Sequence, residues 1–364
     1  EEKRFDETNE SYAEVAKKLN KLMAISQPLF FFLLNIAIIV IFWISSKMIN
    51  VGTLQVGQLV AFIEYLFHAM FSIMLFSMVF VMYPKAQVSA NRIMEVLNTE
   101  PIIKSPKNGI KDTENKGTIE FENVSFTYPN GEEPVIKDVS FSGKKGEVIA
   151  FIGSTGSGKS TLINLIPRFY DVTKGSIKID GVDVRDYDLK YLRKKIGFIP
   201  QKTLLFTGSI ANNIKFGKKD AEYKEVEDSA KIAQAYEFIS NKPNKFDEII
   251  TEGGSNVSGG QKQRLSIARA IVRKPDIYIF DDSFSALDFK TDAILRKELR
   301  SETKDAIVLI VAQRIGSIMD ADKIIVLNEG EVVGIGTHKE LIKNCPIYHE
   351  IATSQLTEEE LANE

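Results

Sequence analysis

A glycine-rich run that ends in a lysine and a serine is the clearest chemical signal in the sequence. Residues 153–160 read Gly-Ser-Thr-Gly-Ser-Gly-Lys-Ser, which matches the pattern GxxxxGK followed by Ser or Thr. The glycines let successive backbone N–H groups turn toward phosphate oxygens. Lys159 would reach the β- and γ-phosphates of a nucleotide, and the Ser160 hydroxyl would hold Mg²⁺. The residues expected to bind the nucleotide here are Gly153, Ser154, Thr155, Gly156, Ser157, Gly158, Lys159, Ser160 and Thr161.

The residues on either side of this phosphate loop have the patterns of a strand and a helix. Residues 148–152 (Val-Ile-Ala-Phe-Ile) form a short apolar run, which predicts a buried strand. Residues 161–170 predict a helix, whose N-terminal N–H groups and dipole would favour a bound phosphate. The motif requires this order of strand, loop and helix, so the sequence predicts a nucleotide site.

A second apolar run ends in two carboxylates. Residues 276–280 (Asp-Ile-Tyr-Ile-Phe) precede Asp281 and Asp282. A strand that carries a carboxylate at its C-terminal end is the Walker B arrangement, in which Asp281 would serve Mg²⁺. The alternative is an acidic loop after a core strand. The phosphate loop elsewhere in the chain favours the metal-binding role.

Further motifs resemble those of ATP-binding cassette (ABC) proteins, and the resemblance covers residues 118–355. Residues 256–264 (Asn-Val-Ser-Gly-Gly-Gln-Lys-Gln-Arg) resemble the family signature, with Val257 where Leu is usual. Tyr128 matches the aromatic residue that stacks on adenine, and Gln201 matches the glutamine that links Mg²⁺ to the membrane part. Residues 285–288 (Ser-Ala-Leu-Asp) match the D-loop.

The resemblance implies that two nucleotide-binding domains share their ATP. In the family, the signature of one domain closes over the ATP that the phosphate loop of the other domain holds. The resemblance therefore implies that four signature residues bind the ATP held by the partner: Ser258, Gly259, Gly260 and Gln261. ATP then joins the two domains, and its hydrolysis or release drives the membrane helices between inward- and outward-open forms.

Two positions depart from the family pattern at the catalytic centre. Members that hydrolyse ATP well have Glu after the Walker B aspartate, where this chain has Asp282. They also have a switch histidine at the position of Gln313, which follows a predicted strand over residues 307–311. Aspartate is one methylene shorter, and glutamine cannot relay a proton as imidazole can. The two changes together resemble the degenerate site of heterodimeric exporters, which binds ATP and hydrolyses it slowly.

The first third of the chain has the composition of membrane-spanning segments. Residues 22–46 contain no charged side chain, and residues 56–84 contain only Glu64 and the usually neutral His68. A helix of 25 residues rises about 37 Å, which exceeds the roughly 30 Å of a bilayer core. The alternative is a pair of buried helices in a large soluble core. Glu64 is a functional candidate because it lies within a span. It is near the outer end, where water can reach it, and this position favours a structural or solvated role.

Basic residues flank the two spans on their outer sides. Lys17, Lys18 and Lys21 precede the first span, and Lys85 and Arg92 follow the second. The positive-inside rule places both outer ends in the cytoplasm and the turn over residues 48–55 outside. Two spans joined to a cassette resemble the last two helices of a six-helix exporter domain. The absence of an initial Met and the charged start suggest a chain that begins within a larger protein.

These patterns predict an α-helical transmembrane segment followed by an α/β P-loop ATPase cassette with a helical subdomain. The expected divisions are residues 1–97 for the transmembrane part, 98–117 for a linker, 118–355 for the cassette and 356–364 for a tail. The linker contains Pro101, Pro106 and the pair Asn108-Gly109, which is typical of a loop.

The overall composition excludes several other kinds of protein. Among 364 residues, 46 Lys and Arg and 49 Asp and Glu give a net charge of −3, which argues against a nucleic-acid partner. The single cysteine excludes an internal disulfide and a cysteine metal cluster, and the three scattered histidines argue against a histidine metal site. We therefore expect one subunit of a heterodimeric exporter in the membrane of a bacterium, with the cassette in the cytoplasm. A homodimeric exporter and a cassette ATPase without transport activity are the alternatives.

Overall fold

The computed structural model describes residues 2–113 and 117–356 and divides the chain into two units. The first unit is Glu1–Glu100 and the second is Pro101–Glu364. The boundary between them falls inside the predicted linker over residues 98–117. Of the predicted tail over residues 356–364, all but Leu356 lies outside the described residues.

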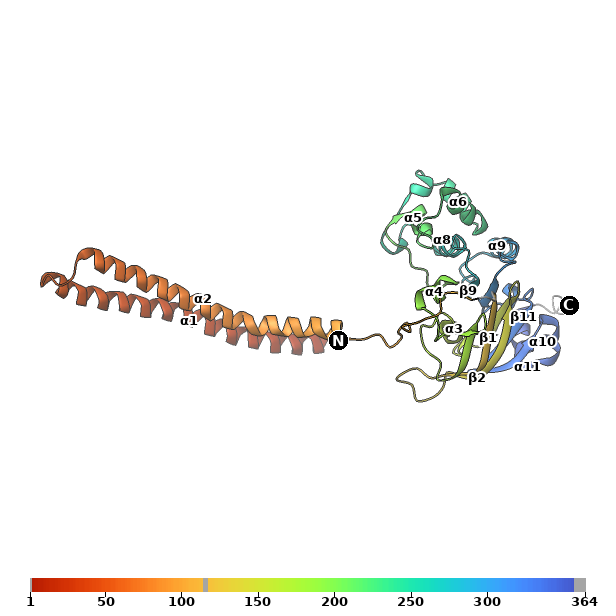
Figure 1. Ribbon diagram of the computed structural model, residues 1–364, viewed down its shortest axis with the longest axis horizontal. Coiled ribbons are helices and arrows are strands. Elements are labelled where there is room, and N and C mark those ends of the chain that lie inside the picture. Colours follow the sequence, from red (N-terminus) through yellow and green to blue (C-terminus); the bar gives the residue numbers. More distant parts are fainter. Residues whose placement is uncertain (1, 114–116, 357–364) are drawn as a thin grey trace. The chain divides into compact units, whose positions relative to one another are not determined.

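The first unit consists of two long helices, α1 (Glu2–Asn50) and α2 (Val56–Asn98). They contact each other and lie side by side in Figure 1. The chain reverses at Gly52, whose φ is +76°, and the Thr53 hydroxyl donates to the carbonyl oxygen of Met48 at 3.0 Å. The side chain of Gln58 accepts a hydrogen bond from the backbone N–H of Gln55, which fixes the start of α2.

Both helices are long and apolar enough to cross a bilayer, and the predicted spans lie within them. In the most apolar segment of 18 residues in α1, 11% of the residues are buried, and in the corresponding segment of α2 none is buried. Large side chains such as Phe32, Trp43 and Phe80 are more than half exposed. This exposure does not fit helices in a soluble core, whereas a lipid environment would cover such side chains. Of the predicted extensions over residues 1–21 and 85–97, residues 2–21 and 85–97 belong to α1 and α2 without a break, and Glu64 is exposed on α2.

The second unit is built around a six-stranded sheet with the order β12-β11-β3-β10-β9-β6. All neighbours are parallel except β12, which pairs antiparallel with β11 at one edge. The strands are β3 (Val148–Gly153), β6 (Ile196–Ile199), β9 (Ile277–Asp281), β10 (Ile307–Val311), β11 (Lys323–Asn328) and β12 (Glu331–Gly336).

Both faces of the sheet are buried along its parallel strands, which is what the short apolar runs predict. Along β3, Ile149 and Phe151 belong to one hydrophobic cluster, and Ala150 and Ile152 belong to the other. The alternation follows from the two-residue period of a strand. The α/β cassette expected from the sequence is therefore confirmed.

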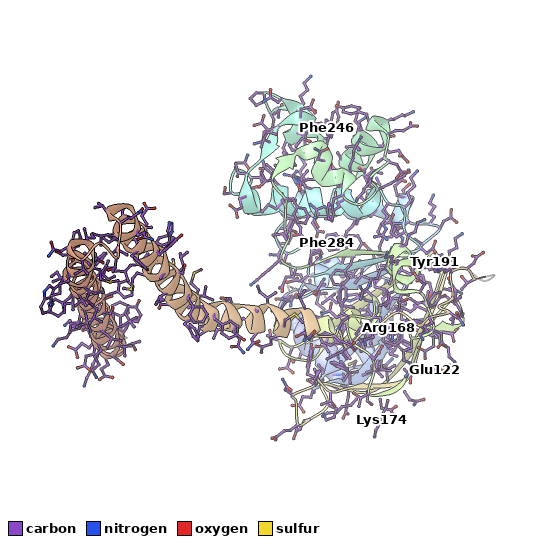
Figure 2. All side chains as sticks on the ribbon, turned by 60° about the vertical axis from the view of Figure 1, so that its left-hand side comes forward. Glu122, Arg168, Lys174, Tyr191, Phe246 and Phe284 are labelled. Atoms are coloured by element: carbon purple, nitrogen blue, oxygen red, sulfur yellow. The ribbon has the colours of Figure 1, made fainter. Side chains whose placement is uncertain are left out.

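A smaller antiparallel sheet, in the order β2-β1-β4-β5, covers part of one face (Figure 1). Glu122 of β1 and Lys174 of β4 mark this sheet in Figure 2. Its strands are β1 (Thr118–Phe126), β2 (Ile136–Lys144), β4 (Lys174–Ile179) and β5 (Val182–Asp183).

A buried ion pair ties the two sheets together. The ammonium group of Lys195, just before β6, donates to Asp180 at 2.7 Å and to Asp276 at 2.9 Å. Asp180 also accepts from the backbone N–H groups of Gly117 and Thr118 at the start of β1. Burial alone would lower the pKa of Lys195, but the hydrogen bonds to Asp180 and Asp276 outweigh it and raise that pKa. Such a pair holds the sheets in one register, because removing either charge would leave the other buried alone.

The chain between β6 and β9 forms a helical subdomain, in which Phe246 is labelled in Figure 2. Its elements are β7 (Gly208–Ser209), α5 (Ile210–Lys215), α6 (Tyr223–Ile232), α7 (Tyr236–Ser240), η1 (Lys245–Asp247), β8 (Ile249–Ile250), η2 (Glu252–Gly254) and α8 (Gly259–Ile271). The other helices of the unit are α3 (Lys159–Leu165), α4 (Leu189–Lys194), α9 (Phe289–Glu302), η3 (Ile315–Ser317), α10 (His338–Asn344) and α11 (Pro346–Thr353).

The helix after the phosphate loop differs from the prediction at both ends. It begins at Lys159 and ends at Leu165, whereas the sequence predicts residues 161–170. Pro167 has no backbone N–H to continue the helix, and Arg168 adopts a positive φ of 53°. The apolar pattern of residues 161–170 is thus partly that of a helix and partly that of a turn packed on the core.

Candidate nucleotide-binding site

The phosphate loop lies at the C-terminal end of β3 and leads directly into α3. Gly158 caps the helix with a φ of +93°, a conformation that side chains with a Cβ rarely adopt. A Cβ at this position would lie 2.7 Å from Cδ1 of Ile136 and 3.0 Å from the carbonyl oxygen of Val135. The close approach of β2 therefore requires glycine here. Every residue from Gly153 to Thr161 that the sequence assigns to the nucleotide lies in this loop or in the first turn of α3.

Lys159 is buried, and its ammonium group lies against the loop itself. It donates to the carbonyl oxygens of Gly153 and Ser154 at 2.9 and 2.8 Å. Burial lowers the pKa of Lys159, while the charges of Asp282 and Asp281 oppose this shift. A phosphate at the loop would supply the negative charge that favours the charged ammonium.

The two side chains expected to hold a metal ion most directly are in contact. The hydroxyl of Ser160, in the first turn of α3, donates to Oδ1 of Asp281 at 2.9 Å. Burial raises the pKa of Asp281, the charge of Asp282 adds to this effect, and the hydrogen bond from Ser160 opposes it. Carboxylate and hydroxyl oxygens are the donors that suit a small divalent cation, and bound phosphates and water would supply its other ligands. Within residues 2–113 and 117–356, no group of three His, Cys, Asp or Glu side chains forms a metal site without such help.

Asp282, Gln313 and Gln201 form one hydrogen-bonded group. The Oδ2 atom of Asp282 accepts from Nε2 of Gln313 at 2.8 Å and from Nε2 of Gln201 at 3.0 Å. The carbonyl oxygen of Val311, at the end of β10, accepts the backbone N–H of Asp282 at 3.0 Å, and Asp282 has a φ of +48°. The structure thus brings together the two residues that depart from the family pattern at the catalytic centre, Asp282 and Gln313, and the glutamine expected to contact Mg²⁺, Gln201, all three of which are expected to take part in catalysis.

Tyr128 lies beside the first turn of α3. Its hydroxyl is 3.0 Å from that of Thr161, and its ring meets Phe126 and Tyr170 edge-on at 4.8 and 5.3 Å between centroids. These contacts place an aromatic ring next to the phosphate loop, as the predicted stacking on adenine requires. The stacking itself stays a prediction.

Replacing Tyr128 tests that prediction. Tyr128→Ala should weaken ATP binding at this site about tenfold or more, because stacking of a base on an aromatic ring contributes roughly 1–3 kcal/mol. Tyr128→Phe is the matched control, since it keeps the ring and removes only the hydrogen bond to Thr161. A direct binding titration with both variants distinguishes the two contributions. Unchanged affinity in Tyr128→Ala would remove this ring from the site.

The signature residues form the exposed start of α8 in the helical subdomain. The Ser258 side chain accepts from the backbone N–H of Gln261 at 3.3 Å, and the Gln261 side chain accepts from that of Ser258 at 3.1 Å. This capping box leaves Ser258 and Gly259 exposed. A Cβ on Gly260 would lie 3.1 Å from the carbonyl oxygen of Ala286, so the D-loop packs closely against the signature. An exposed helix start with free N–H groups is suited to a phosphate supplied from outside this cassette.

Two other glutamines join the site to surrounding elements, and sequence reasoning missed both. Gln263 of α8 is buried, donates to the carbonyl oxygen of Pro200 at 3.4 Å and accepts from the Thr203 hydroxyl, which fixes the loop that carries Gln201. Gln355 contacts the backbone of residues 313 and 315. Gln263 lies in the quoted signature run, which could have drawn attention to it. No local pattern marks Gln355.

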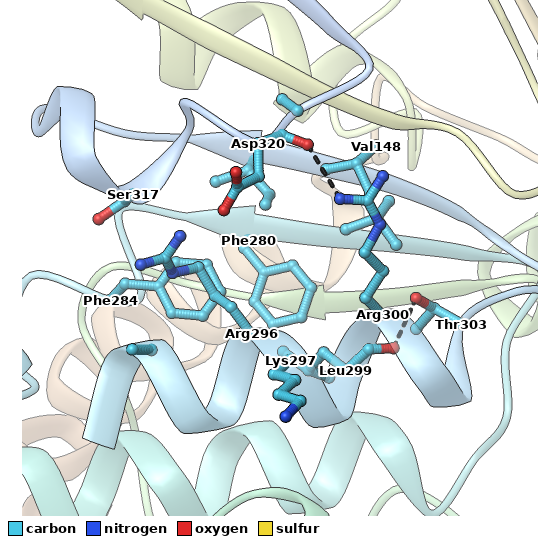
Figure 3. A pocket seen from close by; sticks show the side chains of 14 residues that line it. Val148, Phe280, Phe284, Arg296, Lys297, Leu299, Arg300, Thr303, Ser317 and Asp320 are labelled. Carbon is cyan, nitrogen blue, oxygen red and sulfur yellow. Dashed lines mark hydrogen bonds between the residues drawn. The ribbon is translucent and has the colours of Figure 1, made fainter. Parts of the chain in front are cut away.

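A cavity of about 360 Å³ lies between α9 and the six-stranded sheet (Figure 3). Phe280, Val308 and Ile310 line it, and these residues belong to the hydrophobic cluster opposite the one that contains Leu162 and Ile163 of α3. The cavity therefore lies on the other face of the sheet from the phosphate loop. Because of this position, the cavity does not extend the nucleotide site. Arg296 and Arg300 border it, and both are paired with carboxylates.

Two protein families match separate parts of the chain. Residues 136–285 match the family described as ABC transporter, and residues 1–83 match the ABC transporter transmembrane region. A solved structure described as a bacterial Atm1-family ABC exporter with ATP bound is similar, with a TM-score of 0.77 and 32% sequence identity. That similarity covers 84% of this chain and 54% of the other.

Curated relatives are similar along nearly the whole chain. An uncharacterised ABC transporter ATP-binding protein of Mycobacterium bovis is 38% identical over 359 residues, which cover 98% of this chain and 61% of the relative. A protein of Bacillus subtilis named as a candidate multidrug export ATP-binding/permease protein is 35% identical over 355 residues, with 98% and 61% covered. The chain thus spans about three fifths of the length of these relatives. With its helical transmembrane region and its ATP-binding cassette, the chain belongs to the ABC transporters and has the domain combination of an ABC exporter.

Proposed function

We propose that this chain is one subunit of a heterodimeric ABC exporter in a bacterial cell membrane, with the cassette in the cytoplasm. It binds ATP in a slowly hydrolysing site of its own and supplies its signature to the competent site of a second half-transporter. The single observation that carries this proposal is the contact between Asp282 and Gln313, the two residues that depart from the family pattern.

The geometry of this contact supports the proposal of slow hydrolysis. A general base must offer a lone pair to the proton of the attacking water. Two carboxamide N–H groups, from Gln313 and Gln201, donate to Oδ2 of Asp282, so Oδ1 is the oxygen that would have to accept this proton. Asp282 is also one methylene shorter than glutamate, and a misplacement of about 1 Å can cost about a hundredfold in rate. Gln313 can donate to a γ-phosphate but has no titratable proton to pass on.

The rest of the site is well suited to hold ATP with Mg²⁺. We expect the backbone of residues 153–158 and the Lys159 ammonium to bind the phosphates, and Tyr128 to orient the adenine. Ser160 and Asp281 would hold Mg²⁺, with Gln201 nearby, and the ion when bound would neutralise charge on the β- and γ-phosphates. The site therefore favours tight binding over fast chemistry.

The proposal of export rests on the comparisons, and the proposal of a membrane location rests on the two helices. The similar solved structure is described as an exporter, and a relative is named for multidrug export. The two apolar helices fit the final spans of a multi-pass domain in the lipid bilayer.

The alternative is a homodimeric exporter that tolerates Asp282 and Gln313. The two proposals differ in the ATPase activity of the complete subunit purified alone. If the heterodimer proposal is correct, this activity should be about a hundredfold below that of the complex that forms with the second half-transporter. The Lys159→Ala variant of the isolated subunit gives the background rate of the assay. Equal activity of the subunit alone and of the complex would support the homodimer.

A further inference from the structure

We propose that Gln355 is a positioning residue for the nucleotide site. It follows α11 near the end of the described chain and holds the loop between β10 and η3 in place. Through this loop it would set the position of Gln313, and thereby the ability of the site to distinguish ATP from ADP. This proposal rests on the proposed function, because it concerns what Gln313 does with a bound nucleotide.

The carboxamide of Gln355 uses both of its ends on the same loop. Its Nε2 donates to the carbonyl oxygen of Gln313 at 2.8 Å, and its Oε1 accepts from the backbone N–H of Ile315 at 2.9 Å. Two bonds of good length from one planar group fix both the distance and the orientation of a backbone segment. A carboxylate or a hydroxyl could not provide this donor and acceptor pair in the same geometry.

Gln355 is attached to a rigid part of the cassette. In α11, Tyr348 and Ala352 are fully buried, and α11 contacts β3, the strand that leads into the phosphate loop. The backbone N–H groups of Gln355 and Leu356 both donate to the carbonyl oxygen of Ala352, and Leu356 packs against the core. The exposed carboxamide of Gln355 is therefore carried by a fixed backbone.

The loop that Gln355 holds connects directly to the catalytic residues. At its start, the backbone N–H of Ala312 donates to the carbonyl oxygen of Phe151 in β3 at 3.1 Å. The Gln313 side chain then reaches Asp282 at 2.8 Å. Another side-chain contact on this loop, from Arg314 to the carbonyl oxygen of Ser285, is longer at 3.4 Å. Loss of the Gln355 contacts would release the backbone of Gln313, whose side chain must be positioned toward Asp282 and the γ-phosphate.

A positioning role predicts an effect that depends on the γ-phosphate. ATP has this group and ADP does not, and we expect Gln313 to meet only the γ-phosphate. Gln355→Ala should therefore weaken ATP binding about fivefold, which corresponds to the loss of about one hydrogen bond, and leave ADP binding within about twofold. Gln355→Glu keeps the size and the acceptor for Ile315 but cannot donate to Gln313, so it should show the same selective loss.

The experiment measures ATP and ADP affinity at this chain's site in the complete transporter, with the partner's own nucleotide site inactivated. Ser354→Ala is the matched control, because the Ser354 hydroxyl donates only to the nearby carbonyl oxygen of Ile351 and should leave both affinities unchanged. Thermal unfolding of each variant without nucleotide shows whether the fold is intact.

The outcomes separate this proposal from the one on which it rests. A selective loss of ATP affinity in both Gln355 variants, at unchanged unfolding temperature, supports the positioning role. Equal losses for ATP and ADP, or no loss in Gln355→Glu, would overturn it while leaving the proposed ATP site intact. A wild-type site that fails to bind ATP would instead overturn the proposed function itself.

Discussion

Ser258→Arg is expected to abolish most ATP hydrolysis by the assembled transporter, whereas Asp282→Asn should reduce it only slightly. In the proposed heterodimer, Ser258 belongs to the chain whose own site hydrolyses ATP slowly, yet its signature would complete the partner's competent site. An arginine side chain there would occupy the space that must close on the partner's γ-phosphate. We expect a loss of more than about a hundredfold, as for other misplaced reacting groups.

The structure indicates that Ser258→Arg would act on the partner rather than on this chain's fold. Ser258 is exposed and caps α8 through its bond to the Gln261 N–H. Losing such a cap costs about 1 kcal/mol. Ser258→Ala is therefore the matched control, because it removes the cap without adding bulk. Ser258→Ala also removes a hydroxyl that would face the partner's nucleotide, so it should reduce hydrolysis in part. A clearly larger loss in Ser258→Arg than in Ser258→Ala would assign the difference to the blocked interface.

Asp282→Asn is expected to have little effect for two reasons. Its side chain has the same shape, and its amide oxygen can still accept from Gln201 and Gln313. The site that it alters contributes little to the total rate in the proposed heterodimer. The ATPase activity of Lys159→Ala should fall between those of Asp282→Asn and Ser258→Arg. The substitution weakens binding of the ATP that holds the two domains together, but it does not change the residues of the partner's competent site.

Steady-state ATPase assays of these variants in the assembled complex test the asymmetry. A symmetric homodimer would rely on Asp282 at both of its sites. Loss of that carboxylate would then lower the ATPase rate about as much as loss of the signature. Equal and severe losses in Asp282→Asn and Ser258→Arg would therefore rule out the heterodimer.

The sequence predicted the elements that depend on local patterns. The apolar run over residues 307–311 coincides with β10, and the run over residues 148–152 lies within β3. These strands are buried on both faces, so nearly every residue in them must be apolar, and the pattern identifies them directly. The helix after the phosphate loop was predicted less well, because an apolar stretch packed on the core can also contain a turn such as that at Arg168.

The contacts within the site depend on packing that the sequence does not express. Asp282 and Gln313 follow β9 and β10, which are parallel neighbours, and this pairing brings the two residues together. The bond from Gln355 to Gln313 joins residues that are 42 positions apart and depends on how α11 packs on β3. A glutamine after a helix looks like any exposed polar residue, so its partner could not be predicted.

The double variant Asp282→Glu with Gln313→His should raise hydrolysis at this chain's own site. In the structure the two side chains meet at 2.8 Å, so either substitution alone would disturb the group that includes Gln201. Glutamate reaches roughly 1 Å or more further toward the attacking water, and imidazole can take up or release a proton as the reaction proceeds. If these two positions are the main deficiency, the rise could approach about a hundredfold.

The measurement requires that the partner's site be inactivated, so that turnover at this chain's site is observed alone. The two single variants are controls, and each should gain less than the double variant because the carboxylate and the switch side chain act as one unit. Adding Lys159→Ala to the double variant should remove the gain, since that lysine is expected to bind the phosphates at this site only. A double variant without any gain would mean that Asp282 and Gln313 do not limit this site. The signature that the partner contributes to the site would then be the limiting element, and replacing that signature becomes the decisive substitution.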